Sequence, residues 1–149
     1  MSFITSTGTL IAVVVGEPAT LDQAGFSALT YVNAGEVTNI SEYGATAQVV
    51  THEPLATGVT QKAKGFINNG SVTLQMARDS ADAGQLIFAA GVTGLNKNAE
   101  HSFRVTYQDG SIDYFTGKIF SYTKNPAGAN SVVGSSVQIE INSNIVEVV

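Results

Sequence analysis

The sequence has no cysteine, no tryptophan and few charged residues. Without cysteine the chain can form neither a disulfide framework nor a thiolate metal site, although this absence leaves the redox compartment open. The seven basic residues are scattered from Lys62 to Lys124, and none lies in the first sixty positions. Twelve acidic residues give a net charge of -5. This balance argues against a surface that grips nucleic acid, because such a surface needs clustered lysine and arginine.

Charged residues make up 13% of the chain, whereas hydrophobic residues make up 44%. An ordinary soluble domain contains roughly 25% charged residues. The outside of the folded chain must therefore consist mostly of small and neutral polar side chains. Because a soluble monomer usually keeps more surface charge than this, we expect other copies of the chain, or a partner, to cover much of the surface.

The length fits a single domain spanning residues 1–149, which is large enough to bury a core without disulfides or metals. The first residues contain no basic stretch, and the apolar run Leu10–Val15 is too short for an ordinary signal-peptide core. No apolar run is long enough to span a membrane. We therefore expect no export signal and no membrane association.

Alternating apolar and polar residues predict a series of antiparallel strands. The dipeptide Asp109-Gly110 is typical of a two-residue hairpin turn, and Asn68-Asn69-Gly70 indicates a second turn. The stretch Pro54–Thr60 is expected to be a loop, since proline and glycine punctuate it. The expected extended segments are Leu10–Val15, Leu29–Ile40 with an interruption at Gly35, Ala47–Thr51, Ser71–Ala77, Phe103–Gln108, Ile112–Tyr122 and Val132–Ile141.

One helix is expected at about Ser80–Ala90. Asp79 fits its N-cap and Asp82 its third position, and Gly91 fits a left-handed stop. The sum of these elements is a mainly β domain. The predicted architecture is an antiparallel β-sandwich or partly closed barrel with one flanking α-helix.

Few residues offer catalytic or metal chemistry. His52 beside Glu53 could form a general base or a metal ligand, but nothing near them in sequence completes a triad or a ligand set. The same holds for His101 beside Glu100. Asp79 and the residue three positions later are better explained by helix capping than by a calcium site. We therefore expect no enzyme activity, no metal and no cofactor.

Two further patterns have a structural and a functional interpretation. The stretch between Gly65 and Gly70 precedes a strand and lacks the Gly-Lys-Ser/Thr ending, so it is no phosphate loop. Five aromatic residues on one hairpin could stack sugars or bases, but cross-strand packing is the commoner reason for such a group. These aromatic residues are Tyr107, Tyr114, Phe115, Phe120 and Tyr122.

The order of segments resembles the tail tube (major tail) proteins of long-tailed, non-contractile bacteriophages, over roughly residues 30–148. The residues that carry the resemblance are Asn39–Ser41, Val49–Glu53, Lys64–Leu74, Arg78–Leu86, the hairpin Phe103–Phe120 with Phe115-Thr116-Gly117, and the closing segment Asn130–Ile141. No single motif is diagnostic, and the specificity lies in the order. The N-terminal arm and first strand, residues 1–30, have no counterpart in the pattern.

The resemblance implies a tail-tube fold, six copies closing into a ring, and rings stacking into a hollow tube that conducts DNA without specific binding. It also implies a place in the virion after synthesis in the host cytoplasm. The implied partners are further copies of the chain and other tail proteins, namely the tape measure, tail tip and terminator. A head-to-tail ring of this kind needs different top and bottom surfaces for stacking.

Two sets of residues are candidates for assembly. A loop at about 51–64 is expected to contact the adjacent ring, because it is long and has few apolar anchors. Its candidate contact residues are Thr51, His52, Glu53, Pro54, Leu55 and Gly58. Outward-facing strand residues are expected to line the lumen, where neutral or acidic side chains let DNA slide; these are Glu36, Thr38, Thr73, Gln75, Gln138 and Glu140.

Two other functional classes remain open on sequence grounds. A secretion-tube type of subunit would assemble in a similar way and differ in its cargo. A monomeric β-sandwich that binds a ligand would need an exposed aromatic or carboxylate site. The size of the purified protein separates the tube formers from the monomeric module. The alternative for the polar sheet face is that it lies on the outside of the tube, where its acidic residues keep the tube soluble.

Overall fold

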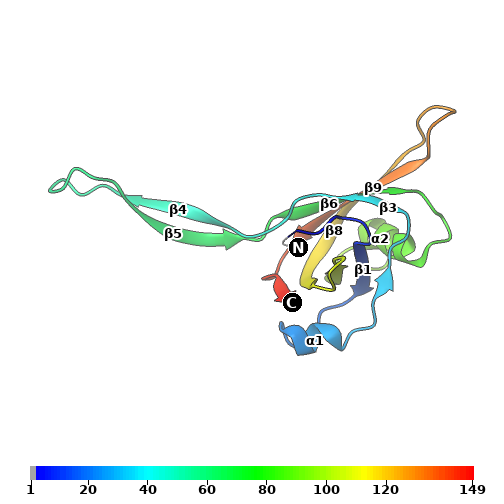
Figure 1. The fold of residues 1–149 in the computed structure, drawn as a ribbon, viewed down its shortest axis with the longest axis horizontal. Helices are drawn as coiled ribbons and strands as arrows, with labels where there is room; N and C mark the ends of the chain where they lie inside the picture. The colour runs from blue at the N-terminus through cyan, green and yellow to red at the C-terminus, as the bar shows by residue number, and fades with distance from the viewer. Residues whose placement is uncertain (1–2) are drawn as a thin grey trace.

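A computed structural model describes residues 3–149 as a β-rich body from which one long hairpin projects (Figure 1). The helices are α1 (Gln23–Ser27) and α2 (Ala83–Thr93). The strands are β1 (Leu10–Val15), β2 (Val32–Asn33), β3 (Val37–Ile40), β4 (Thr46–His52), β5 (Gln61–Asn68), β6 (Ser71–Ala77), β7 (His101–Thr106), β8 (Ile112–Asn125), β9 (Gly134–Ile141) and β10 (Val146–Val148).

The body is one antiparallel sheet with the strand order β2-β1-β7-β8-β9-β6-β3, and β10 pairs with the first part of β8. The sheet is open, with β2 and β3 at its edges. Strand β8 links two halves of the sheet. It pairs with β7 up to Gly117 and with β9 from Gly117 to Asn125. The predicted class is confirmed: the fold is mainly β and antiparallel with one flanking helix, and the barrel does not close.

The sheet curls around an apolar core that α2 helps to cover. Alternate residues of β6 and β9 point into this core and are fully buried, as the period of two predicts. Phe103 and Phe115 stack across β7 and β8 at 5.3 Å between ring centroids. The largest buried side chains of the core are Phe26, Phe88, Phe103, Phe115, Ile11, Leu74 and Ile139.

Helix α2 begins three residues later than the sequence predicts, because Asp82 rather than Asp79 is its N-cap. The Asp82 carboxylate accepts hydrogen bonds from the backbone N–H of Gln85 (3.0 Å) and Gly35 (3.1 Å). Asp79 instead caps the preceding turn through the N–H of Ala81. The proposed stop at Gly91 is also wrong: this residue lies inside the helix, where it is buried against Ile119 and His101.

Two further elements differ from the sequence prediction. The short helix α1 is absent from the sequence prediction, and its N-cap Asp22 accepts from the N–H of Gly25. The segment expected to be a loop at 51–64 forms the outer part of a hairpin instead. Its ends belong to β4 and β5, and only residues 53–60 make the tip.

Candidate assembly surfaces

The hairpin β4–β5, together with its tip at residues 53–60, forms an arm that projects far beyond the body (Figure 1). The two strands pair from Thr46↔Asn68 to His52↔Gln61, with an irregularity in the register between Ala47 and Val49. They make up a separate two-stranded sheet. A two-stranded hairpin is at best marginally stable in water on its own. Little within the described chain therefore supports the arm.

Large apolar side chains on the arm face solvent. Phe66 is 87% exposed and Leu55, at the tip, is fully exposed. The others are Val49, Val50, Val59 and Ile67. Exposed apolar groups of this density mark an interaction surface, so the arm is the strongest candidate for contact with a partner.

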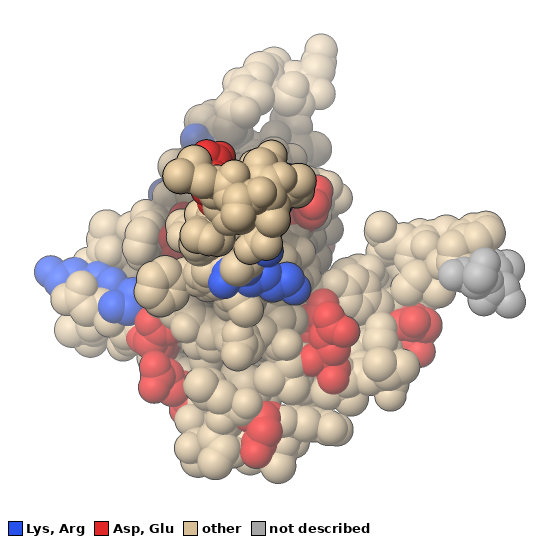
Figure 2. Space-filling view, turned by 90° about the vertical axis from the view of Figure 1, so that its left-hand side faces the viewer, with Lys and Arg blue, Asp and Glu red and all other residues tan. Residues whose placement is uncertain are grey.

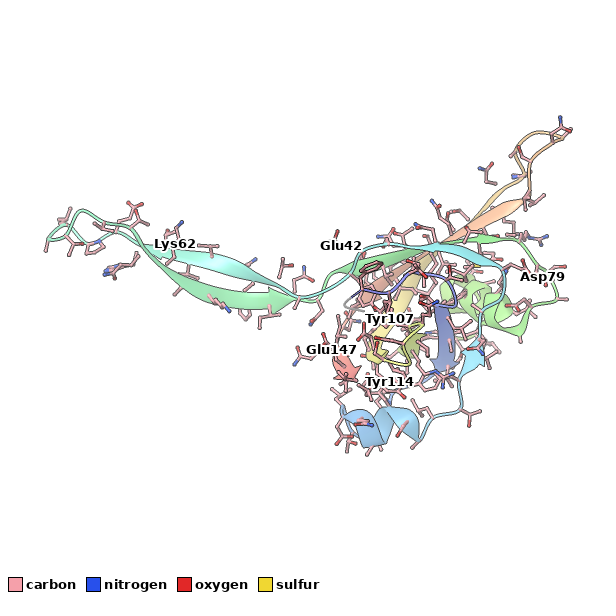
Figure 3. The ribbon with its side chains drawn as sticks, in the orientation of Figure 1. Glu42, Lys62, Asp79, Tyr107, Tyr114 and Glu147 are labelled. Carbon is pink, nitrogen blue, oxygen red and sulfur yellow. The ribbon has the colours of Figure 1, made fainter. Side chains whose placement is uncertain are left out.

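The two faces of the arm differ in charge. Lys62 and Lys64 lie opposite Thr51 and Val49 and share one face with them, whereas Val50 and its cross-strand partner Ala63 lie on the other face. Lys62 projects from the middle of the arm (Figure 3). From the arm side, Figure 2 shows several acidic side chains on the body beneath the arm, and both signs of charge on the arm itself. The arm carries Lys62, Lys64 and Glu53. The arm is thus locally basic on an acidic molecule.

The inter-ring candidates from the sequence all lie on the outer part of the arm. Thr51 and His52 end β4, and the rest form the tip. The tip closes through a hydrogen bond from the Gly58 N–H to the Pro54 carbonyl (3.2 Å), and Gly58 adopts a positive φ of 63°. Pro54 is half-buried and the others, including Glu53 and Leu55, are exposed.

The structure brings four of the six lumen candidates together on one face of the sheet. Thr73 pairs directly with Gln138, and Glu140 pairs with Ser71 on the same two strands. Gln75 continues this face and is exposed, and the Gln138 amide donates to the Glu140 carboxylate at 2.9 Å. The result is a continuous polar face across β6 and β9 whose inner side is the core.

The remaining two lumen candidates lie at the edge. Thr38 on β3 is exposed and its hydroxyl donates to the Gln75 carbonyl at 3.2 Å, which places it beside the polar face. Glu36 precedes β3 in a corner with a positive φ of 62°. Its carbonyl accepts from the Ala77 N–H at 2.9 Å, so Glu36 lies at the end of the strand rather than on its outward face.

Lys118 is the residue that sequence reasoning missed on this face. It lies directly across from Glu140, on the part of β8 that pairs with β9. The neighbouring Ile119 is buried in the core, so Lys118 points outward. Phe120 follows at a break in the register and is 61% exposed. Phe115, Gly117 and Ile119 are buried at alternate positions, and this alternation places Lys118 on the outward face. That Lys118 lies beside Glu140 follows only from the pairing of β8 with β9.

Within residues 3–149, free edges of the sheet lie along β3 and along the last part of β8, besides the two-residue edge strand β2. Strand β3 ends the sheet on one side. On the other side, β8 pairs with β7 only up to Gly117, so its last part has a strand on the β9 side alone. Unpaired strand edges expose N–H and C=O groups that can pair with another chain.

A cleft of about 820 Å³ lies where the arm leaves the body. Asp113 in this cleft accepts hydrogen bonds from the hydroxyls of Tyr43 (2.6 Å) and Tyr107 (2.8 Å), and the two hydroxyls also contact each other. Burial and the hydrogen bond to the carboxylate raise the pKa of Tyr43, and burial raises that of Tyr107. Both phenols therefore stay protonated and can donate at neutral pH. Sequence reasoning did not identify this group.

The remaining sequence candidates do not form a reactive site. His101 is fully buried beside α2, whereas His52 is exposed on the arm. Among residues 3–149 no group of three or more His, Asp or Glu side chains could hold a metal ion. No described helix is long and apolar enough to cross a membrane.

Most of the five aromatic residues pack against their own chain rather than forming a platform. Tyr114 stacks on Phe26 at 5.4 Å between centroids, and Phe115 stacks in the core. Tyr122 packs against the core, and only Phe120 is largely exposed.

Comparison with solved structures identifies the class of fold. The chain is similar to a subunit in the tail of an empty GTA particle refined with C6 symmetry, with a TM-score of 0.69, 12% identity, and 99% of this chain and 100% of that chain covered. It is also similar to a chain of the sheath/tube terminator of an extracellular contractile injection system (TM-score 0.63, 11% identity, 99% and 98% covered). A third similar chain forms the SPP1 tail tube (TM-score 0.60, 10% identity, 93% and 76% covered).

These similarities define a tail-tube-like fold over nearly the whole chain. They include a component of a contractile apparatus, so the fold is not specific to non-contractile phages. No family model and no curated protein matches the sequence.

Proposed function

We propose that this protein is a structural tail-tube subunit whose copies close into rings that stack into a hollow tube. The observation that carries the proposal is a tail-tube-like fold that combines free strand edges on β3 and β8 with a projecting arm lacking its own core. The role is structural rather than enzymatic. The low surface charge supports it, since most sides of a tube subunit are covered by other copies.

Ring closure can follow from the free edges of β3 and β8. In the order β8-β9-β6-β3 every neighbouring pair is antiparallel, so β3 and β8 run in opposite directions. The β3 edge of one copy can therefore pair antiparallel with the free part of β8 in the next copy. Repetition of this head-to-tail contact around an axis gives a closed ring. We propose six copies, as in the C6-symmetric tail that shares the fold.

The polar face of β6 and β9 would then lie on one wall of the ring. We propose that it lines the lumen, with Thr38, Thr73, Gln75, Gln138 and Glu140 toward the passage and Glu36 at its rim. Side chains of this kind offer DNA no cluster of positive charge, and Lys118 is balanced by Glu140 opposite. DNA is the proposed cargo, and it passes without specific binding.

The arm would join one ring to the next. Its exposed apolar residues would be buried against a copy in the adjacent ring, which would stabilise a hairpin that is at best marginally stable alone. The ends of such a tube would meet other tail proteins, for which we propose a terminator, a tail tip and a tape measure. The assembly would belong to a phage or phage-like particle made in the host cytoplasm.

A second candidate is the inner tube of a contractile apparatus, whose subunits would assemble in the same way. The similarity to a sheath/tube terminator favours this alternative. A tube found bare in native particles supports the non-contractile assignment, whereas a tube enclosed in a sheath supports the contractile one.

The direct test is the size and shape of the purified protein. Gel filtration with light scattering over a range of concentrations is expected to show oligomers, and negative-stain electron microscopy is expected to show rings or tubes. A protein that remains monomeric at every concentration, and forms no ring when mixed with its neighbouring tail proteins, contradicts the proposal.

A further inference from the structure

We propose that the cleft at the arm root receives the β8–β9 turn, residues 126–133, of a second copy in the adjacent ring. This inference rests on the proposed stacking of rings. It assigns a contact separate from the arm, so that two interfaces of different chemistry would hold neighbouring rings together.

The turn and the cleft lie toward opposite ends of the sheet. Along β6 and β9 the pair Ser71↔Glu140 lies at the arm end, and the pair Ala77↔Gly134 lies at the other end. The turn begins where β8 ends and finishes where β9 begins, and it projects away from the body on the side remote from the arm (Figure 1). Head-to-tail stacking therefore brings the turn of one copy toward the arm root of the next.

The cleft combines apolar walls with acidic side chains. Its described lining includes Glu42, Asp113 and Glu147 but no lysine or arginine. Glu42 and Glu147 lie near the arm root on either side of Tyr107 (Figure 3). The apolar part of the lining includes Ile4, Ile40, Ile67 and Ile145. An occupant that suits this cleft has apolar side chains together with positive charge.

The β8–β9 turn has these properties. Val132 is 74% exposed and Val133 is 42% exposed, and residues 126–133 contain no acidic group. Two basic residues lie at its base. Lys124 is exposed near the end of β8, and the backbone N–H of Arg78 donates to the Val133 carbonyl at 2.8 Å. Asp79 follows Arg78, but its carboxylate is engaged by the Ala81 N–H.

Because the chain contains no cysteine, introduced cysteine pairs can map the contact without background. The first variant carries Ser6→Cys in the cleft and Val132→Cys on the turn; both positions are exposed. Mild oxidation of its assembled tubes is expected to give a ladder of covalent multimers on a non-reducing gel. A ladder is expected because each copy is linked to the next along the tube.

Two matched pairs make this result specific. Glu17→Cys with Val132→Cys keeps the turn cysteine but moves its partner to an exposed site outside the cleft, and it is expected to give no ladder. Ser6→Cys with Leu55→Cys tests the arm tip as the occupant. A ladder from this pair, and none from Ser6→Cys with Val132→Cys, overturns the assignment of the turn.

A charge exchange gives an independent readout. Glu147→Lys and Lys124→Glu are each expected to raise the protein concentration needed for tube formation by about tenfold, since a small loss per subunit repeats around the ring. The double variant is expected to return toward the wild-type concentration. Single and double variants that all assemble like the wild type contradict the inference. If the variant with Ser6→Cys and Val132→Cys forms normal tubes but gives no ladder, only this contact is refuted, whereas the absence of any oligomer of the wild-type protein refutes the proposed function.

Discussion

Gln85 shows how one buried side chain can hold three segments together. It is 1% exposed, and its amide donates to the carbonyls of Gly35 (3.1 Å) and Ala77 (2.9 Å). Its own carbonyl oxygen accepts from the backbone N–H of Asp79 at 3.0 Å. The residue thereby joins α2 to the end of β6 and to the corner before β3. Since buried polar backbone groups need partners, these three groups depend on Gln85.

Replacing this residue tests that role. Gln85→Leu keeps a side chain of similar size but leaves three backbone groups without their partner, so we expect a loss of about 2–4 kcal/mol in the free energy of unfolding. Chemical denaturation of the unassembled protein measures it. The matched control is Gln138→Leu on the exposed face, where a change within about 0.5 kcal/mol is expected. If Gln85→Leu and Gln138→Leu lower the free energy of unfolding equally, burial of the side chain does not determine the loss of stability.

His101 supplies a pH dependence to the folded state. It is fully buried, and its Nδ1 lies 3.1 Å from the Ala99 carbonyl while its Nε2 has no hydrogen-bond partner. Burial lowers the pKa of His101 below its ordinary value of 6.5, although the Ala99 carbonyl and nearby Glu100 oppose this. The imidazole is therefore neutral in the folded protein near neutral pH.

The sign of the effect follows from proton binding. Below the ordinary pKa of 6.5 the unfolded chain protonates His101 before the folded chain does, so stability is lost as pH falls. The loss from this residue is at most about 1.4 kcal/mol for each pH unit. Denaturation between pH 7 and pH 5 measures it, with His101→Gln as the comparison. The His101→Gln variant is expected to have a lower free energy of unfolding at pH 7, and this free energy should change less with pH than that of the wild type. If it changes equally with pH in both proteins, His101 is not the source of the pH dependence.

At the scale of helices and strands, the sequence predicts those features that are determined by residues close together in the chain. The alternation in β6 and β9 is confirmed, because the side-chain period acts within a few residues. A turn at Asp109-Gly110 does join β7 to β8, but the Tyr107 N–H donates to the Ser111 carbonyl, so the loop has three residues, 108–110, instead of the predicted two. The start of α2 could not be placed, since Asp82 is favoured by its contact with Gly35, which is 47 residues away. The position of Lys118 on the polar face could not be predicted either, because it depends on the pairing of β8 with β9, which the spacing of residues in the sequence does not reveal.

The arm was predicted as a contact segment but not as a hairpin. Residues at 51–52 and 61–64 continue β4 and β5, although they are exposed and have little packing of their own. A strand is recognised in a sequence by the alternation of buried apolar and exposed polar residues. In the single chain neither face of β4 and β5 is buried, so this alternation is missing. Whether these residues contact an adjacent ring stays a prediction.

Removing the tip of the arm tests this role. Deletion of residues 54–58 is expected to leave the body folded, because the arm strands form a separate sheet from the body and contribute nothing to its core. The free energy of unfolding should change by no more than about 0.5 kcal/mol. Electron microscopy of the same preparation is expected to show rings or smaller species but no tubes. Normal tubes from the shortened chain would mean that the tip is not an inter-ring contact.

At the scale of the whole molecule, charge is distributed unevenly over the surfaces that a tube would use. The arm root is acidic, the arm carries Lys62 and Lys64, and the polar sheet face holds one acidic and one basic side chain opposite each other. In a stacked ring every such charge repeats around the axis. A single substitution therefore acts through a ring of identical charges, which is a much larger change than it makes in one copy.

Glu140 offers the sharpest test of which face lines the passage. Glu140→Lys leaves β9 intact, since the side chain is only half-buried and points away from the core, so assembly is expected to continue. Beside Lys118 it would place two positive charges per copy on the polar face, and in a six-fold ring these would hold phosphates along the tube. If the face lines the lumen, particles carrying the mutant tube should deliver DNA slowly or not at all in a genetic complementation assay. The control Glu17→Lys changes an exposed charge off this sheet face and should leave delivery unchanged. Normal delivery by Glu140→Lys particles, with the mutant tubes confirmed in them, would place this face on the outside of the tube.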